Sequence, residues 1–180
     1  MKSNRGDKVA ILDRDGTVVI DRGYLADPAR LEFEAGAAEG LRSLCSLGYR
    51  LVVITNQSGV GRGYFPLQNV WAMNARLQVM VEEIGAKLEG IYFCPHAPDA
   101  GCDCRKPALA LLTQAAAELR FNPACAVVIG DKDSDIEFGR RAGATTILIA
   151  AASADTSRIA ADHVAPDLVA AARILASLQA

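Results

Sequence analysis

Short runs of consecutive apolar residues, many of them β-branched, recur along the chain. Their apolar positions are nearly continuous rather than alternating, which is the pattern of strands buried on both faces of a parallel sheet. The runs predict four clear strands and a weaker fifth, which cover Val9–Leu12, Leu51–Ile54, Ala126–Ile129, Thr145–Ile149 and, as the weaker one, Gly90–Phe93.

The segments between and after these strands repeat their apolar residues every three or four positions, as amphipathic helices do. This spacing predicts helices over Ala37–Leu47, Leu67–Leu88, Ala108–Leu119, Ser134–Ala142 and Val164–Leu178. Strands that alternate with helices are typical of a doubly wound α/β fold with a parallel sheet and right-handed crossovers. Because no repeat, low-complexity tract or linker interrupts the pattern, we expect a single domain over residues 1–180.

The overall composition narrows the class of protein. Of the 180 residues, 51% are hydrophobic and the net charge is only −2, so the chain offers no basic surface for nucleic acid or for a membrane. The N-terminal stretch lacks the apolar region of a signal peptide, and no apolar run approaches the roughly 18 residues of a membrane helix. We expect a cytoplasmic, soluble monomer with no nucleic-acid or membrane partner.

Two aspartates follow the first predicted strand in the stretch ILDRDGTVV. On an extended segment Asp13 and Asp15 point to the same side, so both can face one pocket. Two carboxylates held close together are costly unless a cation neutralises them or one stays protonated. A site in which one binds Mg²⁺ and the other transfers a proton would meet this condition. A solvated turn with two incidental aspartates is the alternative.

Three further polar clusters follow later strands, where a doubly wound sheet binds its ligands. The stretch ITNQSGVGRG combines hydroxyl, amide and glycine residues that suit phosphate oxygens. Lys106 stands just before a predicted helix, and the acidic stretch GDKDSD again matches a site for a hard cation. The side chains of these three clusters that we single out are Thr55, Asn56, Gln57, Ser58, Lys106 and Asp131.

Taken in order, these four clusters resemble the motifs of the haloacid dehalogenase superfamily of phosphotransferases, and the similarity spans most of the chain. The resemblance implies that Asp13 is a nucleophile that forms an aspartyl-phosphate, and that Asp15 is the general acid and then the general base. Thr55 and Lys106 are implied to hold phosphoryl oxygens. Asp131, Asp13 and the main-chain carbonyl of Asp15 are implied to bind the catalytic Mg²⁺.

The stretch YFCPHAPDAGCDCRKP holds three of the five cysteines and one of the two histidines. Cys94, His96, Cys102 and Cys104 form a ligand set suited to tetrahedral Zn²⁺. A redox pair at the last two cysteines and a chance grouping are the alternatives. An odd number of cysteines in a reducing compartment argues against a disulfide framework. The other two, Cys45 and Cys125, lie in apolar surroundings and are expected to be buried.

This stretch resembles the zinc-loop subgroup of the superfamily, which includes heptose-bisphosphate 7-phosphatases and histidinol-phosphate phosphatases. The resemblance implies a structural Zn²⁺ that closes the loop 94–104 and places Arg105 and Lys106 over the site. Only 39 residues separate Asp15 from Thr55, and they suggest a loop and one helix. We therefore expect a capless core with the zinc loop at the rim of the pocket.

Several residues favour a sugar bisphosphate as the small-molecule substrate. The stretches DRGY and TNQSGVGRGYF resemble segments of the heptose branch, which implies that Asp21, Tyr24 and Arg62 lie near the substrate. Lys132 is implied there by the GDK form of the last motif. Arg105 suits a second phosphate, because a guanidinium fork matches phosphate geometry.

Two departures from the heptose pattern keep other substrates open. The gap between His96 and Cys102 is short and closer to the histidinol-phosphate form, and Val19 stands where that branch often has a polar residue. Histidinol phosphate and other sugar phosphates are therefore alternative substrates. A zinc-stabilised binding protein on an inactive phosphatase core is the non-enzymatic alternative, although none of the motif residues is replaced.

Overall fold

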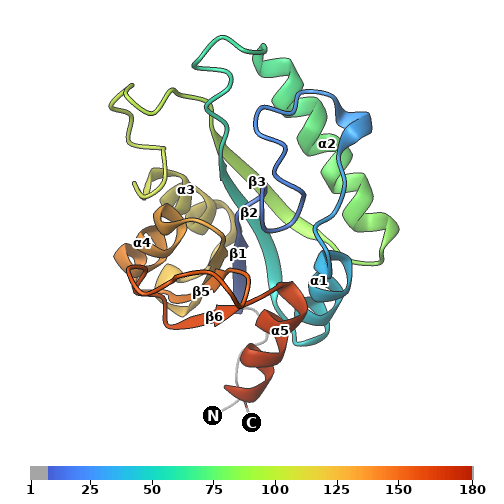
Figure 1. The fold of residues 1–180 in the computed structure, drawn as a ribbon, viewed down its shortest axis with the longest axis vertical. Helices are drawn as coiled ribbons and strands as arrows, with labels where there is room; N and C mark the ends of the chain where they lie inside the picture. The colour runs from blue at the N-terminus through green and yellow to red at the C-terminus, as the bar shows by residue number, and fades with distance from the viewer. Residues whose placement is uncertain (1–7, 180) are drawn as a thin grey trace.

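A six-stranded parallel sheet forms the centre of the computed structural model, which describes residues 8–179 (Figure 1). The strand order is β3-β2-β1-β4-β5-β6, and every neighbouring pair is parallel. The strands are β1 (Val9–Leu12), β2 (Arg50–Asn56), β3 (Leu88–Cys94), β4 (Val127–Gly130), β5 (Thr145–Ile149) and β6 (His163–Ala165).

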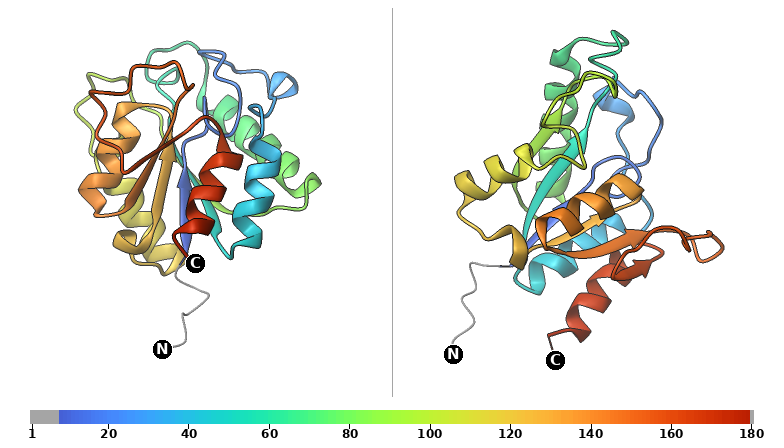
Figure 2. Two further views of the ribbon diagram at one scale, coloured as in Figure 1. Left: turned by 60° about the horizontal axis from the view of Figure 1, so that its bottom comes forward. Right: turned by 90° about the vertical axis from the view of Figure 1, so that its left-hand side faces the viewer.

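Helices cover both faces of this sheet (Figures 1 and 2). One face carries α1 (Ala37–Ser46), α2 (Leu67–Glu83) and α5 (Leu168–Ser177), and the other carries α3 (Ala110–Leu119) and α4 (Asp133–Ala142). Two 3-10 turns, Pro28–Arg30 and Pro123–Cys125, complete the regular structure. The two helical layers enclose two separate hydrophobic cores.

The central strand β1 explains why its apolar run is continuous. Ala10 and Leu12 pack into the core beneath α1, α2 and α5, whereas Val9 and Ile11 pack into the core beneath α3 and α4. All four side chains are at most 1% exposed. A strand buried on both faces needs apolar residues at every position, so the prediction of a doubly wound parallel sheet is confirmed.

The predicted helix Val164–Leu178 was wrong at its start, because residues 163–165 form the edge strand β6. Pro166 disfavours a helical conformation for the residue before it. Asp167 then caps α5, since its carboxylate accepts a hydrogen bond from Ala170 N at 2.7 Å. The predicted helix Leu67–Leu88 was also too long, because α2 ends at Glu83 and Leu88 already belongs to β3.

Two smaller expectations concern burial and domain boundaries. Cys125 is exposed, contrary to the prediction, because it lies in the surface turn before β4, and Cys45 is half-buried. The predicted domain, residues 1–180, extends at both ends beyond the described residues, so its bounds stay a prediction. Within residues 8–179 no extra domain is inserted into the core, and none of the helices is long and apolar enough to span a membrane.

Candidate active site

A cavity of about 310 Å³ opens at the carboxyl end of the sheet, beside the point where the chain order reverses between β1 and β4. This is where a doubly wound sheet binds its ligands. Its volume lies at the lower end of the range of roughly 300–1,000 Å³ for small-molecule sites. Most of the predicted site residues line it: Asp13, Asp15, Asp21, Tyr24, Thr55, Asn56, Gln57, Ser58, Arg105, Lys106 and Lys132.

Asp13 lies at the end of β1 and is 6% exposed. Lys106, which is 4% exposed, donates a hydrogen bond from Nζ to Asp13 Oδ1 at 2.8 Å and another to Ile54 O at 2.6 Å. Lys106 Nζ also forms an ion pair with Asp135 Oδ1 at 2.7 Å. Burial alone would raise the pKa of Asp13, but the ammonium of Lys106 outweighs it and lowers that pKa. Asp13 is therefore ionised.

Three carboxylates lie close together at this position, and two of them, Asp13 and Asp135, pair with Lys106. One oxygen from each of Asp13, Asp131 and Asp135 lies within 4.8 Å of the others. Burial, followed by the charges of the other two aspartates, raises the pKa of Asp131 to about 6 despite the opposing effect of Lys132. Lys132 Nζ lies 3.7 Å from Asp131 Oδ2, so two ammonium groups face three carboxylates. Negative charge is left uncompensated in the cluster, which is the electrostatic condition for a cation site.

Local backbone geometry brings Asp131 close to the first motif. Gly16 has φ +87°, and a Cβ atom built there would lie only 2.4 Å from Asp131 Oδ2. A residue other than glycine would therefore be both strained and in collision with the carboxylate. Thr17 is buried and donates a hydrogen bond from Oγ1 to Asp131 Oδ1 at 3.4 Å, which orients the carboxylate.

Asp15 lines the same cavity as Asp13, and its side chain is 17% exposed. Arg14 Nε lies 3.1 Å from Asp15 Oδ2, and Arg14 Nη2 lies 3.2 Å from Oδ1, so the guanidinium holds both oxygens. Gln57 Nε2 donates a further hydrogen bond to Oδ2 at 2.7 Å. The second carboxylate of the motif is therefore fixed in one orientation.

The polar residues after β2 have distinct contacts. Asn56 forms two hydrogen bonds with the main chain of Lys106: its Nδ2 donates to Lys106 O at 3.2 Å, and its Oδ1 accepts from Lys106 N at 3.0 Å. Gln57 Nε2 also donates to Thr55 Oγ1 at 3.0 Å. Ser58 is half-buried at the cavity wall. Asn56 and Gln57 thus hold other site residues in place, a role that the sequence did not indicate.

Side chains from distant segments form the mouth of the cavity. Lys132 Nζ donates to Asp21 Oδ2 at 3.2 Å, and Tyr24 is half exposed with its ring 4.5 Å from that of Tyr64. Burial lowers the pKa of Lys132, but Asp131, followed by other nearby carboxylates, outweighs it and raises that pKa. Arg62 is exposed and lies outside the cavity lining, unlike the other predicted substrate residues.

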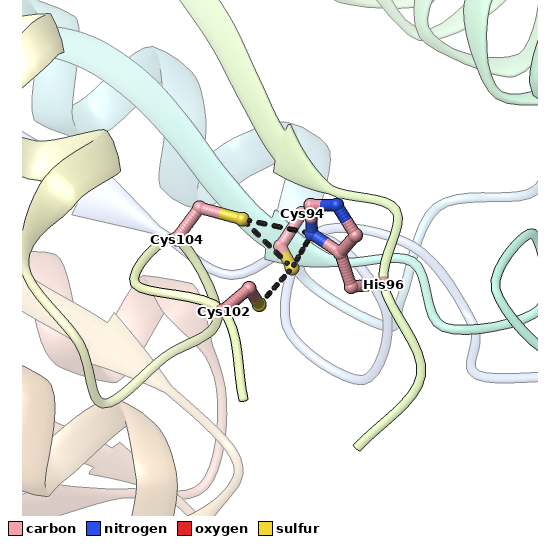
Figure 3. A group of neighbouring side chains, drawn as sticks. All are labelled: Cys94, His96, Cys102 and Cys104. Atoms are coloured by element: carbon pink, nitrogen blue, oxygen red, sulfur yellow. Dashed lines mark hydrogen bonds between the residues drawn. The ribbon is translucent and has the colours of Figure 1, made fainter. Parts of the chain in front are cut away.

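The four predicted zinc ligands converge at the end of β3, as Figure 3 shows. Cys94 Sγ lies 3.6 Å from His96 Nδ1, 3.6 Å from Cys102 Sγ and 3.2 Å from Cys104 Sγ, and His96 Nδ1 lies 3.1 Å from Cys104 Sγ. A tetrahedral ion with Zn–S bonds of about 2.3 Å spaces its sulfur ligands roughly 3.7 Å apart. The donor set and its spacing fit Zn²⁺.

The chemistry of the thiols supports the same conclusion. Burial, followed by hydrogen bonding with Cys104, raises the pKa of Cys94 to about 12. For Cys102, burial is outweighed by hydrogen bonds from Cys94 and Cys104, so its pKa falls to about 7. Without a cation, three thiolates do not coexist here near neutral pH, whereas a bound metal ion stabilises all of them.

The zinc loop is anchored to the segment that follows β2. Gly61 N donates to Pro95 O at 2.8 Å, and a Cβ atom at Gly61 would lie 2.2 Å from the backbone nitrogen of Ala97. Gln57 N donates to Cys94 O at 2.7 Å. The loop thus joins the wall of the cavity just before Arg105, whose Nη1 is buried without a hydrogen-bond partner among the described residues.

Three residues of the site had been assigned no role of their own: Arg14, Thr17 and Asp135. Two of them lie inside the motif DRDGT, and the third belongs to the acidic stretch GDKDSD. The motif itself was a signal for Thr17 and for Asp135, which is 1% exposed while its neighbour Asp133 is exposed. Nothing in the sequence indicated that the cation of Arg14 is buried.

Comparison with known proteins places this geometry in a family. Residues 103–173 match a family model described as HAD-hydrolase-like. The chain is 45% identical over 136 residues to a D-glycero-beta-D-manno-heptose-1,7-bisphosphate 7-phosphatase of Helicobacter pylori, which covers 75% of this chain and 78% of the relative. The enzyme of the same description from Haemophilus ducreyi is 39% identical over 148 residues, covering 78% of this chain and 81% of the relative.

Solved structures agree. The crystal structure of D,D-heptose 1,7-bisphosphate phosphatase from B. bronchiseptica, complexed with magnesium and phosphate, superposes with a TM-score of 0.83 at 27% identity. The match covers 96% of this chain and 99% of that one. The corresponding structure from Burkholderia thailandensis has a TM-score of 0.69 at 25% identity and covers 95% of this chain and 99% of that one.

The chain belongs to the haloacid dehalogenase-like hydrolases and is a phosphoric monoester hydrolase. Within these hydrolases it is similar to phosphatases of a sugar bisphosphate. The predicted superfamily, its fold class and the prediction of an enzyme are thereby confirmed.

Proposed function

We propose that this protein hydrolyses a phosphate monoester with Mg²⁺ through an aspartyl-phosphate on Asp13, and that its substrate is D-glycero-D-manno-heptose 1,7-bisphosphate, from which it removes the 7-phosphate. The observation that carries the proposal is the position of Asp13. It is an ionised carboxylate at the floor of the cavity, bound by Lys106 on one side and adjacent to an acidic cluster on the other.

The acidic cluster fits a magnesium ion, because its carboxylates carry more negative charge than Lys106 neutralises. Asp13 and Asp131 would hold the ion with the main-chain carbonyl of Asp15, and Asp135 lies beside them. When bound, Mg²⁺ supplies countercharge to the phosphoryl oxygens and orients the phosphate for in-line attack.

The chain's own residues divide the reaction into two displacements. A carboxylate oxygen of Asp13 attacks phosphorus, the P–O bond to the sugar breaks, and Asp15 gives its proton to the leaving alkoxide. Asp15, now ionised, takes a proton from water, whose oxygen attacks the same phosphorus and releases phosphate and the free Asp13 carboxylate. Lys106 and Thr55 bind the transferring oxygens throughout.

The substrate assignment rests on relatives and on the charges of the cavity. The similar proteins from two bacteria carry the heptose-bisphosphate phosphatase description. The unpaired guanidinium nitrogen of Arg105 in the cavity wall suits a second phosphate group. Asp21, Tyr24, Ser58 and Lys132 would face the sugar, whereas Arg62 would reach it only if its side chain turned toward the cavity.

We propose that Zn²⁺ at Cys94, His96, Cys102 and Cys104 is structural. Four protein ligands leave no open position for a substrate or a water, so the ion would fix the loop that precedes Arg105 and Lys106. A cytoplasmic location and a monomeric state stay predictions.

The proposal is tested by comparing kcat/KM for the α and β anomers of the heptose bisphosphate with that for histidinol phosphate, in the presence of Mg²⁺ and with zinc bound. We expect kcat/KM for a heptose bisphosphate to exceed that for histidinol phosphate by at least about a hundredfold. When the phosphate on C7 is isotopically labelled, the released phosphate should carry the label. A preference for histidinol phosphate would contradict the substrate but not the mechanism. Release of no phosphate from any of them would contradict the proposed substrate and favour another sugar phosphate.

A further inference from the structure

We propose that Arg14, held by Asn74 of α2, is the positioning residue for the acid–base function of Asp15. This inference rests on the proposed function, since it assigns a residue that acts through Asp15 rather than on the substrate. Arg14 does not line the cavity, and its side chain contacts other protein groups instead.

The hydrogen bonds of Arg14 form one connected network. Nε and Nη2 hold the two oxygens of Asp15 at 3.1 and 3.2 Å. Nη1 donates to Asn74 Oδ1 at 3.1 Å, and Nη2 donates to Gln57 Oε1 at 2.8 Å. Gln57 returns to Asp15 through its amide nitrogen at 2.7 Å. The planar guanidinium therefore has one orientation, and it imposes one orientation on the carboxylate.

Arg14 is buried, so its charge has a desolvation cost that its partners must offset. Arg14 is 2% exposed and is among the largest fully buried side chains of the described residues. A buried guanidinium is tolerated only with a counterion and with hydrogen bonds to its remaining N–H groups. Asp15 is that counterion when it is ionised, and Asn74, 9% exposed in the middle of a helix, accepts a further bond in either state.

The chemistry of the reaction explains why a fixed orientation of the Asp15 carboxylate matters. Asp15 must serve as acid in the first displacement and as base in the second, so its oxygen has to stay within hydrogen-bond reach of two different groups. A carboxylate on a flexible side chain loses rate when it leaves that position. A lysine at position 14 would keep the charge but could not bind both oxygens and Asn74 at once.

The test compares leaving groups. Alkyl phosphates need a proton on the departing oxygen, whereas p-nitrophenolate leaves without one, so only the former depends on Asp15 in the first displacement. For Arg14→Lys we expect kcat on the heptose bisphosphate to fall about 10- to 100-fold with KM nearly unchanged. We expect the pre-steady-state burst of p-nitrophenolate from p-nitrophenyl phosphate to stay within about threefold of the wild-type rate.

Asn74→Ala provides a second variant in case Arg14→Lys folds poorly, and it should show the same selectivity with a smaller loss of about 3- to 10-fold. Asn69→Ala is the matched control, because it removes another hydrogen bond between α2 and a loop, to Ala26 O at 2.9 Å, without touching Arg14. The control should leave both rates within about twofold.

Asp15→Asn separates the two levels of the proposal. Suppose that Asp15→Asn loses kcat on the heptose bisphosphate but keeps the p-nitrophenolate burst. If Arg14→Lys and Asn74→Ala then either behave like the wild type or lose these two rates equally, the positioning role is refuted and the proposed function stands. If Asp15→Asn itself loses both rates equally, the acid–base assignment and the inference built on it are both wrong.

Discussion

Lys106 is a buried cation that pairs with two buried carboxylates, and replacing it by methionine tests the electrostatic account of the site. Its ammonium is bound between Asp13 Oδ1 at 2.8 Å and Asp135 Oδ1 at 2.7 Å, and the two carboxylate residues are 6% and 1% exposed. Methionine preserves most of the side-chain volume, so the substitution removes the charge while leaving little empty space.

The expected loss of stability follows from this burial. At an effective dielectric constant of about 20, two unit charges roughly 2.8 Å apart attract by about 6 kcal/mol, but desolvation offsets much of this. Removing one partner of a buried pair costs about 3–5 kcal/mol, because the remaining charge has no counterion. Because Lys106→Met leaves two buried carboxylates without their counterion, we expect the free energy of unfolding to decrease by an amount near the upper end of that range.

The assay is urea unfolding of zinc-loaded protein at pH 7.5 without magnesium. Lys87→Met is the matched control, because its exposed ammonium pairs with Glu89 at 3.4 Å, outside the cluster, and should contribute only about 0–1 kcal/mol. Adding Asp13→Asn to Lys106→Met should recover part of the loss, since one buried charge disappears. A loss below about 1 kcal/mol for Lys106→Met would refute the electrostatic account of the cluster.

Three further predictions test the metal sites and the cavity. Burial raises the pKa of Asp131 from 3.8 to about 6, so the magnesium-free folded protein binds this proton more tightly than the unfolded chain does. The stability that the protonated carboxyl contributes is therefore present at low pH and is lost as the pH rises through about 6. Mg²⁺ should therefore raise the melting temperature more at pH 7.5 than at pH 5, and an equal increase would contradict the site. Removing zinc with a chelator, or Cys102→Ser, should lower the melting temperature and kcat/KM together, and full activity of a zinc-free protein would refute the structural role. Arg105→Ala should raise KM for a bisphosphate about tenfold or more while Arg62→Ala changes it less than twofold, because only Arg105 lines the cavity.

Local pattern was enough to predict the main strands because each is buried on both faces, so every position of β1 had to be apolar. It was not enough for β6. That strand has three residues and exists only because it pairs with β5, while the residues after it carry the apolar spacing of a helix. Pairing across the sheet decides such a segment, and spacing within it does not.

The same distinction applies to the site. The motif residues could be predicted because each follows a strand whose carboxyl end reaches the same edge of the sheet. The burial of Arg14 could not, because its partners Gln57 and Asn74 lie 43 and 60 residues further along the chain. Asp135 differs from Asp133 only through the rotation of the first turn of α4, which places one carboxylate inside and the other in solvent.

The central claim is that Asp13 carries the phosphoryl group. The most direct measurement uses Asp15→Asn, in which hydrolysis of the intermediate is slow, and phosphorylates it with p-nitrophenyl phosphate, whose leaving group needs no acid. After an acid quench, borohydride reduces an acyl phosphate to an alcohol, so an aspartyl-phosphate becomes homoserine. We predict homoserine at position 13, identified by peptide mass spectrometry, and none in Asp13→Asn. Homoserine at another position, or at none while p-nitrophenolate is released, would contradict the mechanism.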